Sequence, residues 1–236
     1  MKKIYWIHGT KGGVGKSMTA TILTNYLLDE HGAVTVVESD GSAPDVGRRF
    51  VDIDGVNTVS APITDAASIY DALIKLEDVV AEHVVINLPA NAEVLDKKAD
   101  EIAEVTEALE YENRCMFVIG AGNDSARLAG NSMVNGLASI CTKSIAVVNQ
   151  FFGNAITDFA WATSKEAEAW VASGRAKILL PCLDRRITKN PIFISPVTLS
   201  SLADMKKSPL KITERMMVRR WLASGYDVCE QIAGGE

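Results

Sequence analysis

Long apolar runs are absent from this chain of 236 residues, which argues against a membrane-spanning protein. No stretch approaches the roughly 20 apolar residues that a helix needs to cross a bilayer. The apolar start at residues 4–7 is too short for a secretory signal and runs directly into a glycine-rich loop. Low-complexity tracts and internal repeats are also absent, and the composition, 47% hydrophobic and 23% charged, is ordinary for a globular protein. We therefore expect a folded protein in the cytoplasm.

Cysteine is scarce, and its four positions are far apart and form no CxxC pair: Cys115, Cys141, Cys182 and Cys229. A disulfide framework or a structural zinc site needs closer, patterned spacing. We expect these thiols to be buried or incidental in a reducing compartment.

Charge is distributed unevenly along the chain. Residues 1–174 hold 13 Lys and Arg against 24 Asp and Glu, whereas residues 175–220 hold 11 Lys and Arg against three acidic residues. A basic segment on an acidic body is a reason to consider nucleic acid or an anionic membrane as a partner. A solvated surface with uneven charge explains the composition equally well.

Apolar runs rich in Val and Ile alternate with helical patterns. The runs are continuous, as is typical of strands buried on both faces, and lie at 4–8, 34–38, 84–88, 116–119, 145–149 and 178–180, with a weaker candidate at 56–59. Helical patterns lie at about 16–31, 66–81, 93–112, 125–140, 158–173 and 212–233, and Ser164 is a candidate helix cap. This alternation predicts an α/β fold, a mostly parallel twisted sheet with helices on both faces. We expect one domain over 1–236 with a basic portion at about 175–220; residues 184–208 show no clear period.

A glycine-rich loop, Thr-Lys-Gly-Gly-Val-Gly-Lys-Ser at residues 10–17, separates the first strand from the first helix. Glycines let successive backbone N–H groups curl inward toward a phosphate, and the helix N-terminus adds its positive dipole end. Lys16 would supply a cation to the β- and γ-phosphates, and Ser17 a hydroxyl to Mg²⁺. The order strand, loop and helix therefore predicts a P-loop that binds ATP and Mg²⁺, although Thr10 stands where the strict pattern has glycine.

A second lysine, Lys11, changes the interpretation of the loop. The segment Lys-Gly-Gly-Val-Gly-Lys-Ser at 11–17 resembles the deviant P-loop of the ParA/MinD superfamily of dimeric ATPases, which tolerates a residue other than glycine at position 10. The resemblance implies that Lys11 reaches across a dimer interface to the partner subunit's nucleotide, so that activity depends on dimerisation. It assigns nucleotide contacts to Lys11, Gly12, Gly13, Val14, Gly15, Lys16, Ser17, Met18, Asn149 and Pro181, the last two near the adenine.

An acidic pair follows the second strand. The family places a carboxylate at the position of Asp40, near the attacking water and the metal, so the resemblance gives Asp40 a catalytic role beside Lys11 and Lys16. Glu38 matches the first acidic position of a D-x-D form that some members carry. At the end of a parallel strand, such side chains lie on the ligand side of an open sheet.

The chain departs from the family at Asn87. The run Val-Val-Ile-Asn-Leu-Pro at 84–89 resembles the Walker B strand, but an amide replaces its aspartate. An amide oxygen still accepts from a metal or its waters, more weakly than a carboxylate. The expected metal site consists of Ser17, Asp40 and Asn87, and three outcomes are open: Asn87 suffices because Asp40 carries the metal site, hydrolysis is slow, or ATP acts as a switch with hardly any turnover. Residues 90–93 stand where the family has its γ-phosphate-sensing loop.

The basic portion favours DNA as the surface that is bound, because phosphate contacts depend on charge and need no base reading. The candidates are Arg185, Arg186, Lys189, Lys206, Lys207, Lys211, Arg215, Arg219 and Arg220. A membrane-binding helix is the rival, but the pattern at 212–233 continues with acidic residues and is typical of a docked core helix.

These features together predict a ParA-like ATPase that dimerises on ATP, binds DNA nonspecifically and serves in plasmid or DNA partition, with a partner protein stimulating its turnover. The alternatives are a MinD-like membrane-associated switch and a nucleotide-dependent interaction protein with little hydrolysis. A bridging iron–sulfur cluster is disfavoured by the positions of Cys115 and Cys141. Dethiobiotin-synthetase-like ligases share the fold but lack the second lysine.

Overall fold

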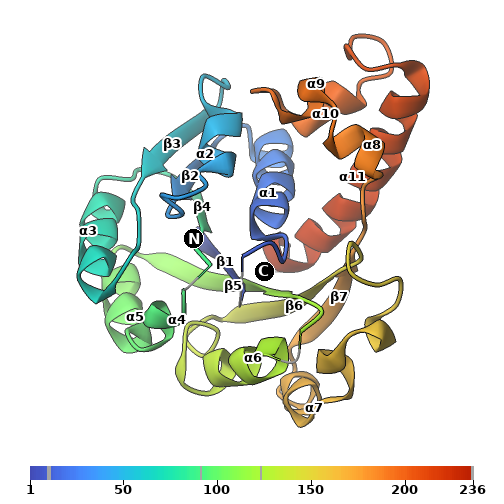
Figure 1. Ribbon diagram of the computed structural model, residues 1–236. Coiled ribbons are helices and arrows are strands. Elements are labelled where there is room, and N and C mark those ends of the chain that lie inside the picture. The colour runs from blue at the N-terminus through green and yellow to red at the C-terminus, as the bar shows by residue number, and fades with distance from the viewer. Residues whose placement is uncertain (10–11, 91, 123, 235–236) are drawn as a thin grey trace.

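A seven-stranded sheet, parallel throughout, organises the part of the chain that the computed structural model describes, residues 1–9, 12–90, 92–122 and 124–234. The strand order is β3-β2-β4-β1-β5-β6-β7 (Figure 1). The strands are β1 (Lys2–Gly9), β2 (Val34–Glu38), β3 (Val56–Ser60), β4 (His83–Asn87), β5 (Tyr111–Ile119), β6 (Lys143–Asn149) and β7 (Ala176–Leu180). The predicted α/β fold class is confirmed.

Helices cover both faces of the sheet (Figure 1). Along β1, Ile4 and Trp6 point into one core layer, while Tyr5 and Ile7 point into the other, as strand geometry requires. One face is covered by α3 (Ala66–Glu77), α4 (Glu93–Asp96), α5 (Ala99–Ala108), α6 (Asp124–Asn135) and α7 (Lys165–Ala172). The other is covered by α1 (Lys16–His31), α2 (Asp45–Phe50), α8 (Arg185–Thr188), α9 (Pro191–Ile194), α10 (Leu199–Ala203) and α11 (Ile212–Ala233).

Four predicted helices are wrong in extent, and two of them, α3 and α6, simply end four and five residues before the predicted ends at 81 and 140. The pattern at 93–112 forms α4 and α5 and then enters β5, and the chain turns at Glu110, whose φ of 62° is left-handed and ends the helical run. The pattern at 158–173 begins as two short 3₁₀ turns, Ile156–Asp158 and Ala160–Thr163. The α-helix starts only after Ser164, whose hydroxyl accepts from the Ala167 N–H at 3.1 Å, so the predicted cap is confirmed.

The last helix is docked along its length and at its end. Its inward stripe, which includes Val218, Trp221 and Val228, is buried against α1 and the sheet. No helix among the described residues is long and apolar enough to cross a membrane. The acidic, polar end of the pattern at 212–233 therefore belongs to a docked helix, as its sequence predicts.

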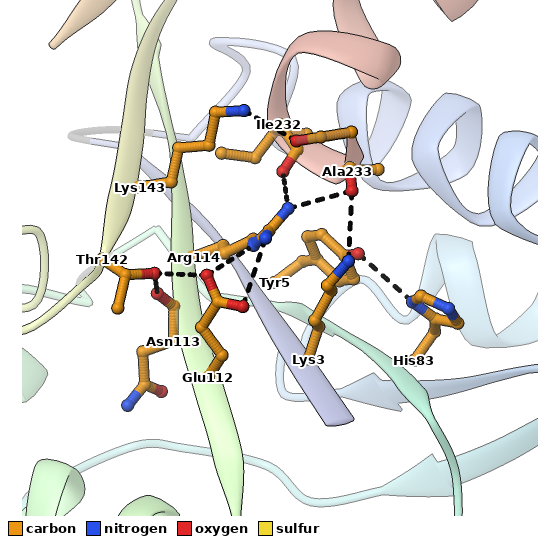
Figure 2. Close-up of polar contacts among 11 residues, drawn as sticks. Lys3, Tyr5, His83, Glu112, Asn113, Arg114, Thr142, Lys143, Ile232 and Ala233 are labelled. Carbon is orange, nitrogen blue, oxygen red and sulfur yellow. Dashed lines mark hydrogen bonds and ion pairs between the residues drawn. The ribbon is translucent and has the colours of Figure 1, made fainter. Parts of the chain in front are cut away.

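Three cations at the amino ends of the strands hold the carbonyl end of α11 (Figure 2). Lys3 Nζ lies 3.4 Å from the Ala233 oxygen, Arg114 Nη1 donates to the Ile232 and Ala233 oxygens at 2.5 and 2.9 Å, and Lys143 Nζ donates to the Gly234 oxygen at 2.8 Å. A helix C-terminus exposes unpaired carbonyls and the negative end of its dipole, so cations stabilise it there. We refer to Lys3, Arg114 and Lys143 as the C-terminal clamp.

Candidate nucleotide-binding site

The glycine loop joins β1 to α1 at the carboxyl edge of the sheet. Gly13 and Gly15 have φ of +79° and +106°, a left-handed backbone that glycine adopts without strain. A Cβ added to Gly15 would clash with Asn149 Nδ2, so close packing also requires glycine there. Thr10 and Lys11 lie outside the described residues. The contact of Lys11 with the nucleotide of the partner subunit therefore stays a prediction.

Asn149 supports the loop from the end of β6. Its Nδ2 donates to the Val14 carbonyl at 2.9 Å, its Oδ1 accepts from the Phe151 N–H at 3.0 Å, and the side chain is buried. The amide thus braces the loop from within the protein, and its contact with adenine stays a prediction. Pro181 follows β7, and its carbonyl accepts from Trp221 Nε1 at 2.8 Å, which ties this rim to α11.

Lys16 begins α1 and is only 6% exposed. Burial lowers the pKa of its ammonium group to about 8, and the nearby Asp40 carboxylate opposes that shift. Removing an ammonium group from water disfavours its charged form and so lowers its pKa. An anion bound in the loop would favour the charged form and raise the pKa again. Burial at the start of α1 is compatible with the predicted phosphate contact of Lys16, which stays a prediction.

ATP affinity should fall as the pH rises through the pKa of Lys16. Below about 8 the ammonium group is charged, whereas above it a bound triphosphate must first draw a proton onto the lysine. We expect ATP to bind roughly tenfold more weakly at pH 9.5 than at pH 7.5 in a titration with a fluorescent analogue. Lys16→Arg keeps its charge over this range and should bind with a flatter profile. A wild-type affinity that is constant over this range would contradict the assignment.

Asp40 lies just beyond β2 and near Lys16, as its influence on the lysine pKa indicates. Its Oδ1 accepts from the N–H groups of Ser42 and Ala43, each at 3.1 Å, and from Ser42 Oγ at 2.6 Å. These bonds form a tight turn that fixes a half-buried carboxylate at the edge of the site. The Asp40 carboxylate raises the pKa of the Lys16 ammonium group against the effect of burial, and its catalytic role stays a prediction.

Glu38 and Asn87 form a buried pair at the ends of neighbouring strands. They are register partners between β2 and β4, and Asn87 Nδ2 donates to Glu38 Oε1 at 2.7 Å. Burial raises the pKa of Glu38, although its hydrogen bonds, including those from Gly47 and Asn87, oppose the rise. Asn87 Oδ1 is buried and accepts no hydrogen bond within the described part of the chain. Sequence reasoning missed this pairing, because the two residues are joined only by strand register.

The oxygen groups at this edge fit Mg²⁺. Ser17 offers a hydroxyl, Asp40 a carboxylate and Asn87 a buried amide oxygen in need of a partner. No group of three or more His, Cys, Asp or Glu residues that could hold a metal occurs among the described residues. Mg²⁺ binds through few protein oxygens together with waters and substrate phosphates, so this sparse set is compatible with it.

A hollow of about 450 Å³ lies beside the first turns of α1. Ser17 and Met18 line it, as does Thr188 from α8, and Met18 is among the predicted nucleotide contacts. Another hollow, of about 850 Å³, lies on the other face between α4, α6 and α7. The first hollow adjoins the end of the glycine loop through Ser17, whereas Lys16, Asp40 and Asn149 are not among its lining residues.

The predicted DNA-binding residues differ in how free they are. Arg215 is half-buried and donates to the Leu210 and Met205 carbonyls at 2.6 and 2.9 Å, so it organises the preceding loop. Arg186 pairs with Asp184 at 2.7 Å, and Arg185 lies over the Phe151 ring at 4.7 Å. The remaining candidates are exposed: Lys189, Lys206, Lys207, Lys211, Arg219 and Arg220.

Comparisons with known proteins agree with this geometry. No known family model matches the sequence. An ADP-bound nucleotide-binding protein from Archaeoglobus fulgidus superposes with a TM-score of 0.52 at 12% identity, over 79% of this chain and 84% of that one. A ParA family ATPase from Chlorobium tepidum TLS gives 0.52 at 16%, over 94% and 98%. The chain has the fold of the P-loop nucleotide-binding proteins.

One relative matches this protein over nearly its whole length. Protein MobD of Acidithiobacillus ferrooxidans is 26% identical over 234 residues, 98% of each protein. Together with the solved structures, it bears out the resemblance to ParA/MinD-like P-loop ATPases at the level of the fold.

Proposed function

We propose that this P-loop protein is an ATPase that binds ATP with Mg²⁺, dimerises on ATP and binds DNA nonspecifically, in plasmid or DNA partition or positioning. The observation that carries the nucleotide site is Lys16, buried at the start of α1 in a glycine loop that Asn149 braces. The ParA family ATPase of similar fold supports the same class of activity.

The residues at the site suit phosphoryl transfer. Lys16 would neutralise charge on the phosphates, and Asp40 would orient the attacking water near the metal. Ser17 and Asn87 would hold Mg²⁺, which neutralises charge developing on the phosphoryl oxygens when bound. Lys11 would complete the site of the partner subunit, and a stimulating partner protein would act on this dimer.

The exposed cations support a DNA surface. Arg219 and Arg220 lie on the solvent side of α11, whose opposite side is buried in the core. A membrane anchor would have to expose that buried side, which the C-terminal clamp opposes. These contacts favour DNA over the membrane-associated alternative.

The deciding experiment measures DNA binding with ATP, with ADP and without nucleotide, while light scattering follows the mass of the same samples. DNA binding by an ATP-dependent dimer is the expected result. An ATP dimer without affinity for DNA would remove the partition role. The absence of ATP binding would refute the nucleotide site itself.

Replacing Arg219 and Arg220 together by Glu should weaken DNA binding about tenfold or more and reduce its salt dependence, because each phosphate contact releases about one counterion. Filter binding over a series of salt concentrations measures both. Lys97→Glu/Lys165→Glu is the matched control, since it changes the charge equally at exposed positions around the 850 Å³ hollow. If both double variants lose DNA affinity equally, the effect comes from net charge alone and not from Arg219 and Arg220 in particular.

Asn87 favours a second candidate, a nucleotide-dependent interaction protein with little hydrolysis. An amide holds Mg²⁺ more weakly than the carboxylate it replaces. ATP-dependent dimerisation with negligible phosphate release, even with DNA present, would favour this candidate over the ATPase.

A further inference from the structure

We propose that Glu38 is a positioning residue, which orients the amide of Asn87 so that Oδ1 is presented to Mg²⁺ or to a water bound to it. The proposal rests on the proposed nucleotide site and assigns a role to its unusual pair of residues. A carboxylate on β2 and an amide on β4 would together replace a single carboxylate on β4.

The contact between the two side chains determines which way the amide faces. A carboxylate accepts hydrogen bonds and donates none, so only the NH₂ group of Asn87 can face Glu38 Oε1, at 2.7 Å. The carbonyl oxygen is then directed away from Glu38. It is buried and without a hydrogen bond among the described residues, and such an acceptor is costly unless a ligand or water satisfies it.

Backbone donors prevent Glu38 from turning away. Its Oε2 accepts from the Val46 and Gly47 N–H groups at 3.1 and 3.0 Å, and its Oε1 also accepts from the Asp40 N–H at 3.2 Å. A Cβ on Gly47 would lie 3.3 Å from Glu38 Cβ, so the backbone closes tightly over this side chain. The carboxylate is therefore a fixed acceptor for the Asn87 amide.

The pair also explains why an amide can be required at position 87. Both side chains are buried, with Glu38 4% and Asn87 1% exposed. An aspartate at 87 would have no N–H to donate to Glu38 Oε1, so the 2.7 Å hydrogen bond would be replaced by a contact between two acceptors. Glu38 thus selects Asn over Asp.

Four variants test the mechanism. Mg²⁺ is expected to increase the affinity for a fluorescent ATP analogue, and the quantity measured is the Mg²⁺ concentration at which half of this increase is reached. Glu38→Gln keeps an acceptor for Val46 and Gly47 but turns an NH₂ group toward Asn87, so the Asn87 amide should flip and lose its outward oxygen. We expect the Mg²⁺ requirement to rise about tenfold or more, which is typical when a partner of a metal ligand is lost. Asn87→Ala should raise it to a similar extent.

Glu38→Gln should have much less effect in the Asn87→Ala background than alone, because Glu38 acts chiefly through Asn87 and its bond from the Asp40 N–H is the one other route to the site. The transposed pair Glu38→Gln/Asn87→Asp should restore the wild-type Mg²⁺ requirement or lower it. In that variant the new amide at position 38 on β2 donates to the new carboxylate at position 87 on β4. The second oxygen of that carboxylate then points away from position 38, as Asn87 Oδ1 does in the wild type. Affinity for the analogue in EDTA should be the same in all variants.

A normal Mg²⁺ requirement in Glu38→Gln, or additive effects in the Asn87→Ala background, would overturn the proposal. If Glu38→Gln does not fold, the transposed pair provides the test. A Mg²⁺ requirement as high as that of Asn87→Ala would then overturn the proposal. Failure of the wild-type protein to bind the analogue both in EDTA and at saturating Mg²⁺ refutes the nucleotide site instead, so the two failures are distinguishable.

Discussion

Lys16→Ala is expected to weaken ATP binding by about 100-fold or more, because it removes the charge-assisted contacts that a loop lysine makes with phosphate. Thermal stability should be unchanged or higher, since a buried cation with a lowered pKa is replaced by a small apolar group. Isothermal titration and a thermal melt measure the two effects.

Lys165→Ala is the matched control for this change. Lys165 is an exposed lysine that also begins a helix, α7, on the other face of the sheet. It should bind ATP as the wild type does. Tight binding by Lys16→Ala would refute the P-loop assignment, and a large loss of stability would show that the lysine serves the fold.

Gly15→Ala is expected to produce the second large effect, a loss of both stability and ATP affinity. A left-handed φ costs a residue with a Cβ about 1–2 kcal/mol, and the added methyl would also clash with Asn149 Nδ2. The loop must then shift, and its bond from Asn149 to the Val14 carbonyl breaks. Urea unfolding and ATP titration should both register the change.

Gly13→Ala separates the two causes. Gly13 also has a left-handed φ, but a Cβ there would meet nothing within 4 Å. It should therefore show the conformational cost alone and lose less stability than Gly15→Ala. Adding Asn149→Ala to Gly15→Ala removes the clash and should cost less than the sum of the single changes. Equal stability losses in the two glycine variants would contradict this account of the loop.

The sheet and the phosphate loop could be predicted from sequence because their signals are local. Strands buried on both faces are continuous runs of Val and Ile, and the loop requires glycine, lysine and serine at fixed spacing. Lys16 and Ser17 follow from such signals, whereas Asp40 is named only through the family resemblance. The structure adds what holds them, the Asn149 brace and the Asp40 turn.

The rest depends on contacts distant in sequence. The short helices α8, α9 and α10 are below the length at which a helix is stable alone, and they are fixed by burying Ile187, Phe193 and Leu202 under the sheet. The pairing of Glu38 with Asn87 follows from strand register. Arg215 looks like a free cation in the sequence, but carbonyls of its own preceding loop occupy it.

The C-terminal clamp also brings the start of β1 and the end of α11 together. Lys3 in the first strand lies 3.4 Å from the oxygen of Ala233, so the two ends meet at the amino edge of the sheet, away from the P-loop (Figure 2). A short peptide linker can therefore join them, and new ends can be opened in a surface loop elsewhere. A circularly permuted chain made in this way would keep the glycine loop continuous between β1 and α1, with the linker at the opposite edge of the sheet.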